Sequence, residues 1–222
     1  MIAIIDYGMG NLGSVAKACR FLGARVQVTD SPAAVRRARA VIFPGVGAFG
    51  EAMRELRKRQ LADPLRESIH AGKPFLGLCL GMQLLFESSE ESPGVRGLGV
   101  FPGRVRRLPR KRGLKIPHMG WNQLEKQRGR DGRAPFKRVA EDPLLRGVPD
   151  GAFVYFVHSF YADPEDKSFI SARTAYGLDF PAALWNSGSV WATQFHPEKS
   201  QRWGLKILGN FLTSASAKVE QK

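Results

Sequence analysis

Cysteine is scarce in this chain of 222 residues, which contains only Cys19 and Cys79. The two lie far apart in unlike surroundings, which excludes a disulfide framework and any metal site built on closely spaced cysteines. Long apolar runs are also missing, so we expect neither a membrane span nor a signal peptide. These absences predict a cytoplasmic protein that is not associated with a membrane and has no metal site.

Acidic residues are few as well: 20 Asp and Glu stand against 34 Lys and Arg, a formal net charge of +14. Such a basic balance can indicate nucleic-acid binding. The positive charge is scattered over separate segments, however, without interleaved aromatic residues that could stack on bases. We therefore expect no nucleic-acid partner and interpret the charge as an arginine-rich surface.

Strands and helices alternate through the first half of the sequence, a pattern typical of a parallel sheet with helices on both faces. Short apolar runs predict the strands, and helical periodicity bounded by glycine and proline signals predicts the helices. The strands expected are 2–5, 24–28, 40–43 and 75–78, and the helices are 12–22, one opening at 30–32, 49–70 with an interruption at 63–64, and 80–87.

From about Gly97 the pattern changes to short β-type runs separated by glycine and proline turns. The chain is long enough for one α/β domain with a full core. We predict a single domain over residues 1–213, with a mixed, mostly parallel sheet flanked by helices and a flavodoxin-like core, and a flexible tail at 214–222. The later strands expected are 98–101, 104–108, 121–124, 153–157, 168–175, 182–186 and 189–194, with a mobile loop at 126–135 and a closing helix at 204–212.

Cys79 lies at a sharp transition from a buried strand to a helix, between Gly77 and Gly81. The pattern G-x-C-x-G is the sulfur version of a nucleophile elbow, in which a tight turn needs small neighbours. Such a turn also sets the thiol against free N–H groups that favour the thiolate. The alternative is an inert buried cysteine, which the elbow alone leaves open.

A second motif near the end of the chain supplies a base and a carboxylate, His196 and Glu198. If the strand continues to His196, residues i and i+2 point to the same side of it. Glu198 could then hold one ring nitrogen of His196 while the other faces a thiol. Nucleophile, base and orienting carboxylate together predict a catalytic triad for covalent acyl transfer.

At these two motifs the chain resembles the class I, or triad, glutamine amidotransferases. Four further segments narrow the resemblance to the glutaminase subunits of imidazole glycerol phosphate synthase, which act in histidine biosynthesis. The segments are Asp6–Asn11, Pro44–Phe49, Pro117–Asn122 and Tyr155–Phe160. The resemblance implies a heterodimer with a (βα)8-barrel synthase subunit, to which ammonia released from L-glutamine is delivered.

Two backbone N–H groups are expected to hold the tetrahedral oxyanion of such a reaction. Ligands bind at the carboxyl ends of parallel strands, where the turn after Cys79 and the turn at 45–47 can face each other. We predict Leu80 as one donor and Val46 as the other, because the flanking Gly45 and Gly47 let the peptide plane turn either way. An ordinary turn without a catalytic part is the alternative.

The rest of the glutamine pocket rests on the resemblance. It implies that Gln83, one helical turn after the nucleophile, holds the amino and carboxylate end of glutamine. It also implies that His158, Ser159 and Phe160 form the opposite wall. Without the resemblance, a histidine after an apolar strand is as often a structural residue.

Exposed Met and Trp residues on a loop favour an interface with another protein. The resemblance implies that five residues face the barrel subunit: Asn11, His118, Met119, Trp121 and Lys199. For Trp121, a place in the core is the alternative.

The sequence therefore predicts a glutaminase that works through a cysteine thioester and needs no metal or organic cofactor. Two rivals remain: a triad enzyme that serves another synthase or hydrolyses another γ-glutamyl substrate, and a non-catalytic binding subunit on the same fold. The segments at 6–11 and 117–122 argue against the first, and the intact triad argues against the second.

Overall fold

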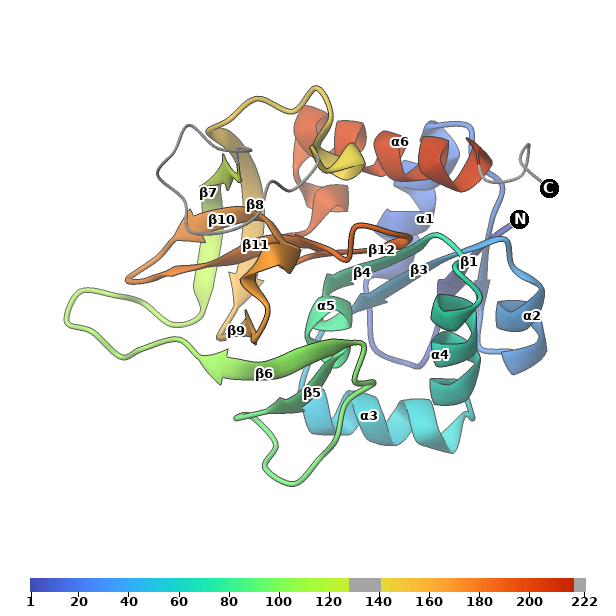
Figure 1. Ribbon diagram of the computed structural model, residues 1–222, viewed down its shortest axis with the longest axis horizontal. Coiled ribbons are helices and arrows are strands. Elements are labelled where there is room, and N and C mark those ends of the chain that lie inside the picture. The colour runs from blue at the N-terminus through green and yellow to red at the C-terminus, as the bar shows by residue number, and fades with distance from the viewer. Residues whose placement is uncertain (128–140, 218–222) are drawn as a thin grey trace.

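The computed structural model describes residues 1–127 and 141–217. They form a nine-stranded sheet in the order β2-β1-β3-β4-β12-β11-β10-β7-β8 and a three-stranded sheet in the order β5-β6-β9 (Figure 1). The strands are β1 (Ile2–Ile5), β2 (Val26–Thr29), β3 (Ala40–Gly45), β4 (Phe75–Cys79), β5 (Phe86–Ser89), β6 (Phe101–Arg107), β7 (His118–Lys126), β8 (Ala152–His158), β9 (Phe160–Pro164), β10 (Ile170–Ala175), β11 (Asp179–Trp185) and β12 (Val190–Thr193).

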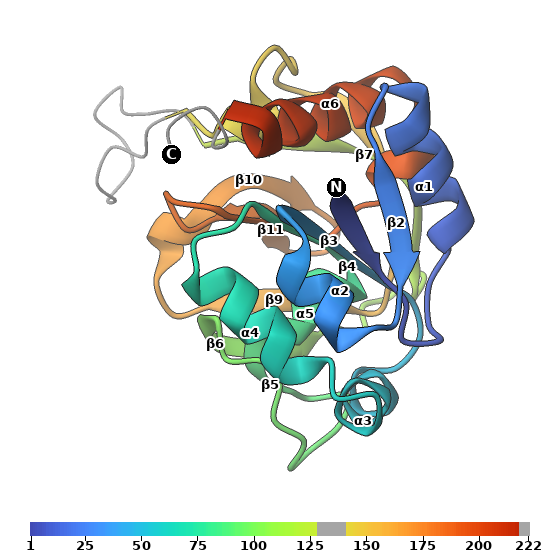
Figure 2. The ribbon, with the colours of Figure 1, turned by 90° about the vertical axis from the view of Figure 1, so that its right-hand side faces the viewer.

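The helices follow the expected alternation in the first half of the chain. They are α1 (Leu12–Phe21), α2 (Pro32–Arg37), α3 (Phe49–Lys58), α4 (Ala62–His70), α5 (Leu80–Leu84) and α6 (Gln201–Ala217), with short 3-10 turns at η1 (Pro143–Leu145), η2 (Lys167–Phe169) and η3 (Pro197–Lys199). Figure 2 shows α1 and α6 on one face of the large sheet and α2, α3 and α4 on the other.

Alternating side chains of the parallel strands explain these two layers. Ile2 and Ile4 pack in the core beneath α1 and α6, whereas Ala3 and Ile5 pack in the core beneath α2 to α5. Because successive side chains of a strand point to opposite faces, a continuous apolar run is buried on both sides. The predicted α/β architecture is confirmed.

The large sheet is half parallel and half antiparallel. Strands β2, β1, β3, β4 and β12 run parallel, and β11, β10, β7 and β8 continue the sheet in antiparallel pairs. β12 comes late in the chain but inserts between β4 and β11. This insertion brings the segment after β12 next to the end of β4, where Cys79 lies.

Several expected boundaries are wrong. The helix at 80–87 ends at Leu84, and residues 86–89 form β5. The sequence also missed β9, and the two strands expected at 98–101 and 104–108 are replaced by one strand, β6. The interruption of 49–70 lies at Gln60, whose φ is 55°, whereas Asp63 and Pro64 lie in the first turn of α4, where a proline is tolerated.

The two segments expected to lack structure differ in part from the prediction. The expected mobile loop at 126–135 begins on Lys126, which is the last residue of β7. α6 continues to Ala217 and buries Ala215, so the expected frayed tail cannot begin at residue 214. The remainder of both predictions, at 128–135 and 218–222, lies outside the described residues. Among the described residues, no helix is long and apolar enough to cross a membrane.

Candidate active site

Cys79 is the last residue of β4, and α5 begins at the next residue. Its φ of 53° lies in the left-handed region, which is strained for a residue with a side chain. A Cβ on Gly81 would lie 1.8 Å from the carbonyl oxygen of Phe43, and one on Gly77 would lie 3.0 Å from that of Gly81. The flanking glycines are therefore required by close backbone contacts, as the elbow pattern predicts.

The thiol is nearly enclosed, with Cys79 only 6% exposed. Its sulfur lies 3.8 Å from the carbonyl oxygen of Val157 and 3.8 Å from Nε2 of Gln194, which donates to it. Neither neighbour was singled out from the sequence. Gln194 lies directly after β12, two residues before His196.

His196 and Glu198 are in direct contact. Nδ1 of the imidazole lies 2.8 Å from Oε1 of the carboxylate, and the two side chains are 4% and 2% exposed. The expected backbone is wrong, however: β12 ends at Thr193, and Glu198 lies in the 3-10 turn η3 rather than in extended chain. The turn begins with Pro197 and still brings the carboxylate back to the ring.

A second set of hydrogen bonds holds the backbone of His196. Its N–H donates to the carbonyl of Tyr155 on β8 at 2.9 Å, and its carbonyl accepts from the Ser200 hydroxyl at 2.6 Å. The N–H of Tyr155 donates in turn to the same hydroxyl oxygen at 3.0 Å. Strand β8 therefore positions the imidazole.

The electrostatics of the histidine favour its protonated form. Burial alone would lower the pKa of His196, but the charge and hydrogen bonding of Cys79 and of Glu198 together raise it to about 10. Nε2 of the ring is buried and has no partner of ordinary hydrogen-bond geometry among the described residues. It is the ring atom left free to exchange a proton with the thiol.

The other cysteine has a different environment. Cys19 is fully buried in the core beneath α1 and α6, and burial raises the pKa of its thiol to about 11. A thiol with such a pKa is rarely ionised at neutral pH and is a poor nucleophile. This environment is that of a structural residue.

A cavity of about 290 Å³ opens at Cys79. It is lined by Val46, Gly47, Cys79, Leu80, Gln83, Glu91, Pro117, Val157, His158, Ser159 and Phe160. Eight of these residues were expected at the site from the sequence, whereas Glu91, Pro117 and Val157 were not. The cavity does not expose Gly45, which is buried beneath it.

The two expected oxyanion donors lie at the ends of adjacent strands. Gly45 pairs with Cys79 in the parallel register of β3 and β4, so Val46 and Leu80 each follow one member of this pair. The N–H of Leu80 belongs to the first residue of α5, where it has no partner within the helix. Gly47 has a φ of 98°, which favours glycine.

Gln83 and His158 meet at one backbone carbonyl, that of Phe160. Nε2 of Gln83 and Nδ1 of His158 each lie 2.9 Å from this oxygen. Nε2 of Gln83 also donates to Oε1 of Gln194 at 3.1 Å. Both hydrogens of the Gln83 amide are therefore used within the protein, which leaves its carbonyl oxygen for a ligand.

The second ring nitrogen of His158 lies 3.0 Å from Nδ1 of His118. Because Phe160 offers only an acceptor, Nδ1 of His158 donates, Nε2 accepts, and Nδ1 of His118 must donate. Burial lowers the pKa of His118 to about 4 and that of His158 to about 3, so both rings are neutral. His158 has no ring nitrogen left for glutamine and can serve the pocket only as a wall.

His118 does not lie on the molecular surface. It is 3% exposed, and its ring stacks on Tyr176 with centroids 4.0 Å apart. Its expected place in an interface is therefore wrong for the side chain. The segment is a strand, not a loop, and alternation along β7 turns His118 inward while Met119 and Trp121 point outward.

The other expected interface residues are accessible. Met119 is 62% exposed and Trp121 46% exposed, which argues against a core role for Trp121. Asn11, just before α1, and Lys199 in η3 are also exposed, and Nζ of Lys199 lies 5.9 Å from the ring centre of Tyr155.

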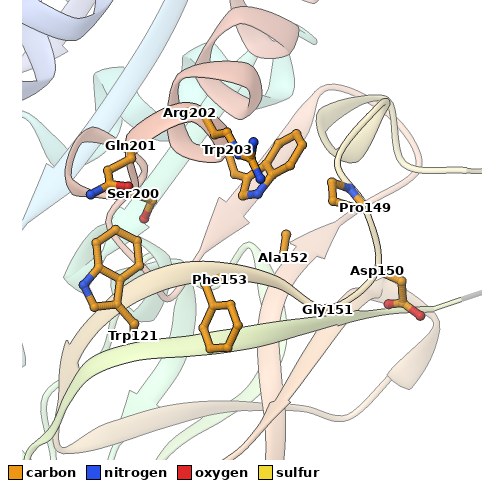
Figure 3. Close-up of a pocket in the computed structure, with 10 residues that line it drawn as sticks. All are labelled: Trp121, Pro149, Asp150, Gly151, Ala152, Phe153, Ser200, Gln201, Arg202 and Trp203. Atoms are coloured by element: carbon orange, nitrogen blue, oxygen red, sulfur yellow. The ribbon is translucent and has the colours of Figure 1, made fainter.

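A second hollow of about 500 Å³ lies beside Trp121 (Figure 3). Trp121 and Phe153 line it from β7 and β8, and Arg202 and Trp203 line it from the start of α6. Its described lining residues include no cysteine, no histidine and no member of the triad. We therefore assign the chemistry to the cavity at Cys79.

The chain has relatives among known proteins. The family model described as "Glutamine amidotransferase class-I" matches residues 3–215. Two relatives carry the name "Imidazole glycerol phosphate synthase subunit HisH". The one from Desulfitobacterium hafniense (strain DSM 10664 / DCB-2) is 49% identical over 95% of this chain and 93% of its own. The one from Geobacter metallireducens (strain ATCC 53774 / DSM 7210 / GS-15) is 50% identical over 96% and 98%.

Solved structures share the fold at much lower identity. A structure titled "Crystal structure of glutamine amidotransferase" superposes with a TM-score of 0.72 at 18% identity, covering 97% of this chain and 99% of its own. The structure of PurLQS from Thermotoga maritima gives a TM-score of 0.68 at 17% identity, covering 96% and 97%. These likenesses show the fold, and the matches in sequence show that the chain belongs to the class I glutamine amidotransferase family and is a HisH-type subunit within it.

Proposed function

We propose that the chain is the glutaminase subunit of imidazole glycerol phosphate synthase and hydrolyses L-glutamine to glutamate and ammonia. The observation that carries this proposal is that Cys79 lines the cavity while the buried imidazole of His196 interacts with both the Cys79 thiol and the Glu198 carboxylate. The nucleophile sits on a strained elbow, and a buried carboxylate orients the base at 2.8 Å. This is the arrangement that thiol acyl transfer requires.

The first half-reaction forms a thioester. His196 takes the thiol proton through Nε2, and the sulfur of Cys79 attacks the side-chain amide carbon of glutamine. The N–H groups of Val46 and Leu80 hold the developing oxyanion. His196 then returns the proton to the leaving nitrogen, the C–N bond breaks, and ammonia departs.

The second half-reaction consumes water. His196 takes a proton from a water molecule, whose oxygen attacks the thioester carbon. The C–S bond breaks, the sulfur regains the proton, and glutamate leaves. Glu198 stays ionised throughout and stabilises the imidazolium. No step needs a metal or an organic cofactor.

The far end of glutamine is recognised by the rest of the cavity. The carbonyl oxygen of Gln83, with the backbone at Ser159 and Phe160, can bind the amino acid end. Glu91 supplies a negative charge that suits an α-ammonium group. One of its carboxylate oxygens already accepts from the N–H of Phe49 at 2.7 Å, which fixes the side chain at the cavity.

The ammonia acceptor is a separate subunit. The relatives are named as subunits of a synthase, and we propose that this chain forms a heterodimer with a (βα)8-barrel cyclase in the cytoplasm. Asn11, Met119, Trp121 and Lys199 are the residues proposed to face it. Exposed Met and Trp side chains such as these are enriched where proteins associate.

The partner should also control the glutaminase. The Gly45–Val46 peptide can rotate because glycine tolerates either orientation, and only one orientation presents the Val46 N–H to the oxyanion. Loss of one such donor lowers the rate by about 10²–10³ in other enzymes. We expect the isolated chain to be nearly inactive and the barrel subunit with bound nucleotide to raise turnover by that order.

A steady-state assay tests both the low activity of the isolated chain and its activation by the loaded barrel subunit. Glutamate release is measured for the chain alone, with the barrel subunit, and with the barrel subunit plus its nucleotide substrate. Full turnover by the isolated chain, unchanged by the loaded partner, would contradict the switch. Activation by the cyclase of a different pathway, and not by this one, would favour another synthase as the partner.

The nucleophile is tested in the same complex. Cys79→Ala should abolish glutamine hydrolysis but leave synthesis from added ammonia intact. A glutamine-analogue electrophile should label Cys79, as seen by mass spectrometry of peptides. Labelling of Cys19 instead would contradict the assignment.

A further inference from the structure

Tyr7 follows β1 and has a hydroxyl group that lacks a partner. The residue is 0% exposed, and its ring packs against Phe43 with centroids 5.6 Å apart. No hydrogen-bond partner for the hydroxyl exists among residues 1–127 and 141–217. A buried polar group without a partner is rare and destabilising, so its presence calls for a physical reason.

The hydroxyl is a donor and not an anion. Burial raises the pKa of Tyr7 well above its usual range, and the nearby charge of Cys79 raises it further. Tyr7 therefore keeps its proton at any pH at which the enzyme works, and the O–H is available to an acceptor.

The hydroxyl lies against the backbone of Gly45. A Cβ on Gly45 would lie 2.1 Å from the Tyr7 oxygen and 3.1 Å from Cβ of Leu80. The Tyr7 oxygen therefore occupies the space between the end of β3 and the start of α5. These are the two places from which the proposed oxyanion donors, Val46 and Leu80, extend.

The same loop also reaches the other end of the oxyanion segment. A Cβ on Gly47 would lie 2.6 Å from Cε of Met9, so the Met9 methyl group packs on Gly47. Residues 7–11 thus contact both glycines that flank Val46. Asn11, which is proposed to face the partner, ends this loop just before α1.

We propose that Tyr7 is a positioning residue for the oxyanion donor. When the Gly45–Val46 peptide rotates to present the Val46 N–H to the substrate, its carbonyl group turns as well. The Tyr7 hydroxyl donates to the carbonyl oxygen of Gly45 in that orientation and holds the peptide there. This inference rests on the proposed glutaminase function. It assigns the positioning of the Val46 N–H, the oxyanion donor, to the side chain of Tyr7.

The arrangement explains why an unpartnered hydroxyl is kept in the core. The hydrogen bond of the Tyr7 hydroxyl is missing in one orientation of the Gly45–Val46 peptide and present in the other. It therefore shifts the equilibrium toward the orientation that presents the Val46 N–H to the substrate. Losing the partner of a buried hydroxyl shifts an equilibrium by about 5- to 160-fold. The catalytic step, and not glutamine binding, should carry this effect.

Tyr7→Phe tests the proposal, because it removes the oxygen and keeps the ring that packs on Phe43. In the complex with the loaded barrel subunit, we expect kcat to fall at least about fivefold while KM stays within about twofold. The midpoint of thermal unfolding should stay the same or rise, because the variant no longer buries an unpartnered group.

Tyr161→Phe is the matched control, since it removes a tyrosine hydroxyl from β9 and should leave kcat unchanged. If Tyr7→Phe retains the wild-type kcat, the proposal is wrong. It is also wrong if kcat, affinity and thermal stability fall together, which would indicate a structural hydroxyl. A wild-type complex that hydrolyses no glutamine would instead refute the glutaminase function, and the role of Tyr7 with it.

Discussion

Replacing Glu198 by Gln removes one charge from the triad and little else. The carboxylate lies 2.8 Å from Nδ1 of His196, and neither side chain is more than 4% exposed. A glutamine side chain at position 198 has nearly the same shape as glutamate, and its amide oxygen can still accept a hydrogen bond from Nδ1 of His196. The variant therefore separates the charge of the orienting group from its hydrogen bond.

The size of the effect follows from this geometry. Two unit charges 2.8 Å apart attract by about 6 kcal/mol at an effective dielectric constant near 20. The retained hydrogen bond offsets about 1 kcal/mol of this loss. We expect turnover to fall by about 10³–10⁴ in Glu198→Gln, against about 10⁶ in His196→Ala, in line with other triads.

The pH profile should change in a defined direction. The bond and charge of Glu198 help to raise the pKa of His196 to about 10. Without the charge that pKa falls, so the imidazolium that protonates the leaving nitrogen is lost at lower pH. The alkaline limb of kcat/KM should therefore move to lower pH in Glu198→Gln.

The assay is glutamate release by the loaded complex from pH 6 to 10, with thermal unfolding as a check on folding. Glu165→Gln, an exposed glutamate after β9, is the matched control and should match the wild type. An equal loss in Glu198→Gln and His196→Ala, or an unmoved alkaline limb, would refute an orienting role.

Two further predictions concern stability. Gly81→Ala should abolish activity and lower the midpoint of unfolding, because its Cβ would lie 1.8 Å from the Phe43 carbonyl oxygen; Gly13→Ala, which meets nothing within 4 Å in α1, should be neutral or stabilising. The lowered pKa values of His118 and His158 leave both rings neutral in the folded state, whereas unfolded histidine binds a proton below about pH 6.5. Stability should therefore be lost from about pH 6.5 down to about pH 4, by about 1.4 kcal/mol per pH unit for each ring. Urea unfolding at pH 7 and pH 5 should show a smaller loss in His118→Gln than in the wild type, and an equal loss would contradict this reasoning.

The parallel half of the fold was predictable because its strands are short apolar runs bounded by turns. The errors fall where long-range pairing decides the structure. The apolar run Leu84 to Phe86 crosses from α5 into β5, and only the pairing of residues 86–89 with β6 makes them a strand. A single sequence cannot distinguish these cases, since a short apolar run suits a buried helix or a strand.

The candidate site was likewise predictable only in part. Cys79, His196 and Glu198 are carried by local motifs, and the structure brings them together as expected. The inward direction of the His118 side chain was predictable, because alternation along β7 determines it. Tyr7 lies in the segment 6–11 that carries the resemblance, but its own role was not predictable, since it depends on a hydroxyl that has no partner among the described residues once the chain is folded.

The place of β12 in the sheet has a consequence for the order in which the protein can mature. Val190 to Thr193 pair with Phe75 to Leu78, and the N–H of Phe75 donates to the carbonyl of Ser189 at 2.8 Å. Until that late segment leaves the ribosome, β4 is an open apolar edge, and such an edge can pair with other chains. His196 emerges only after β12, so an unfinished chain has its nucleophile without its base. An unfinished chain therefore cannot hydrolyse glutamine through the triad, whereas its open β4 edge stays available for pairing until β12 is added.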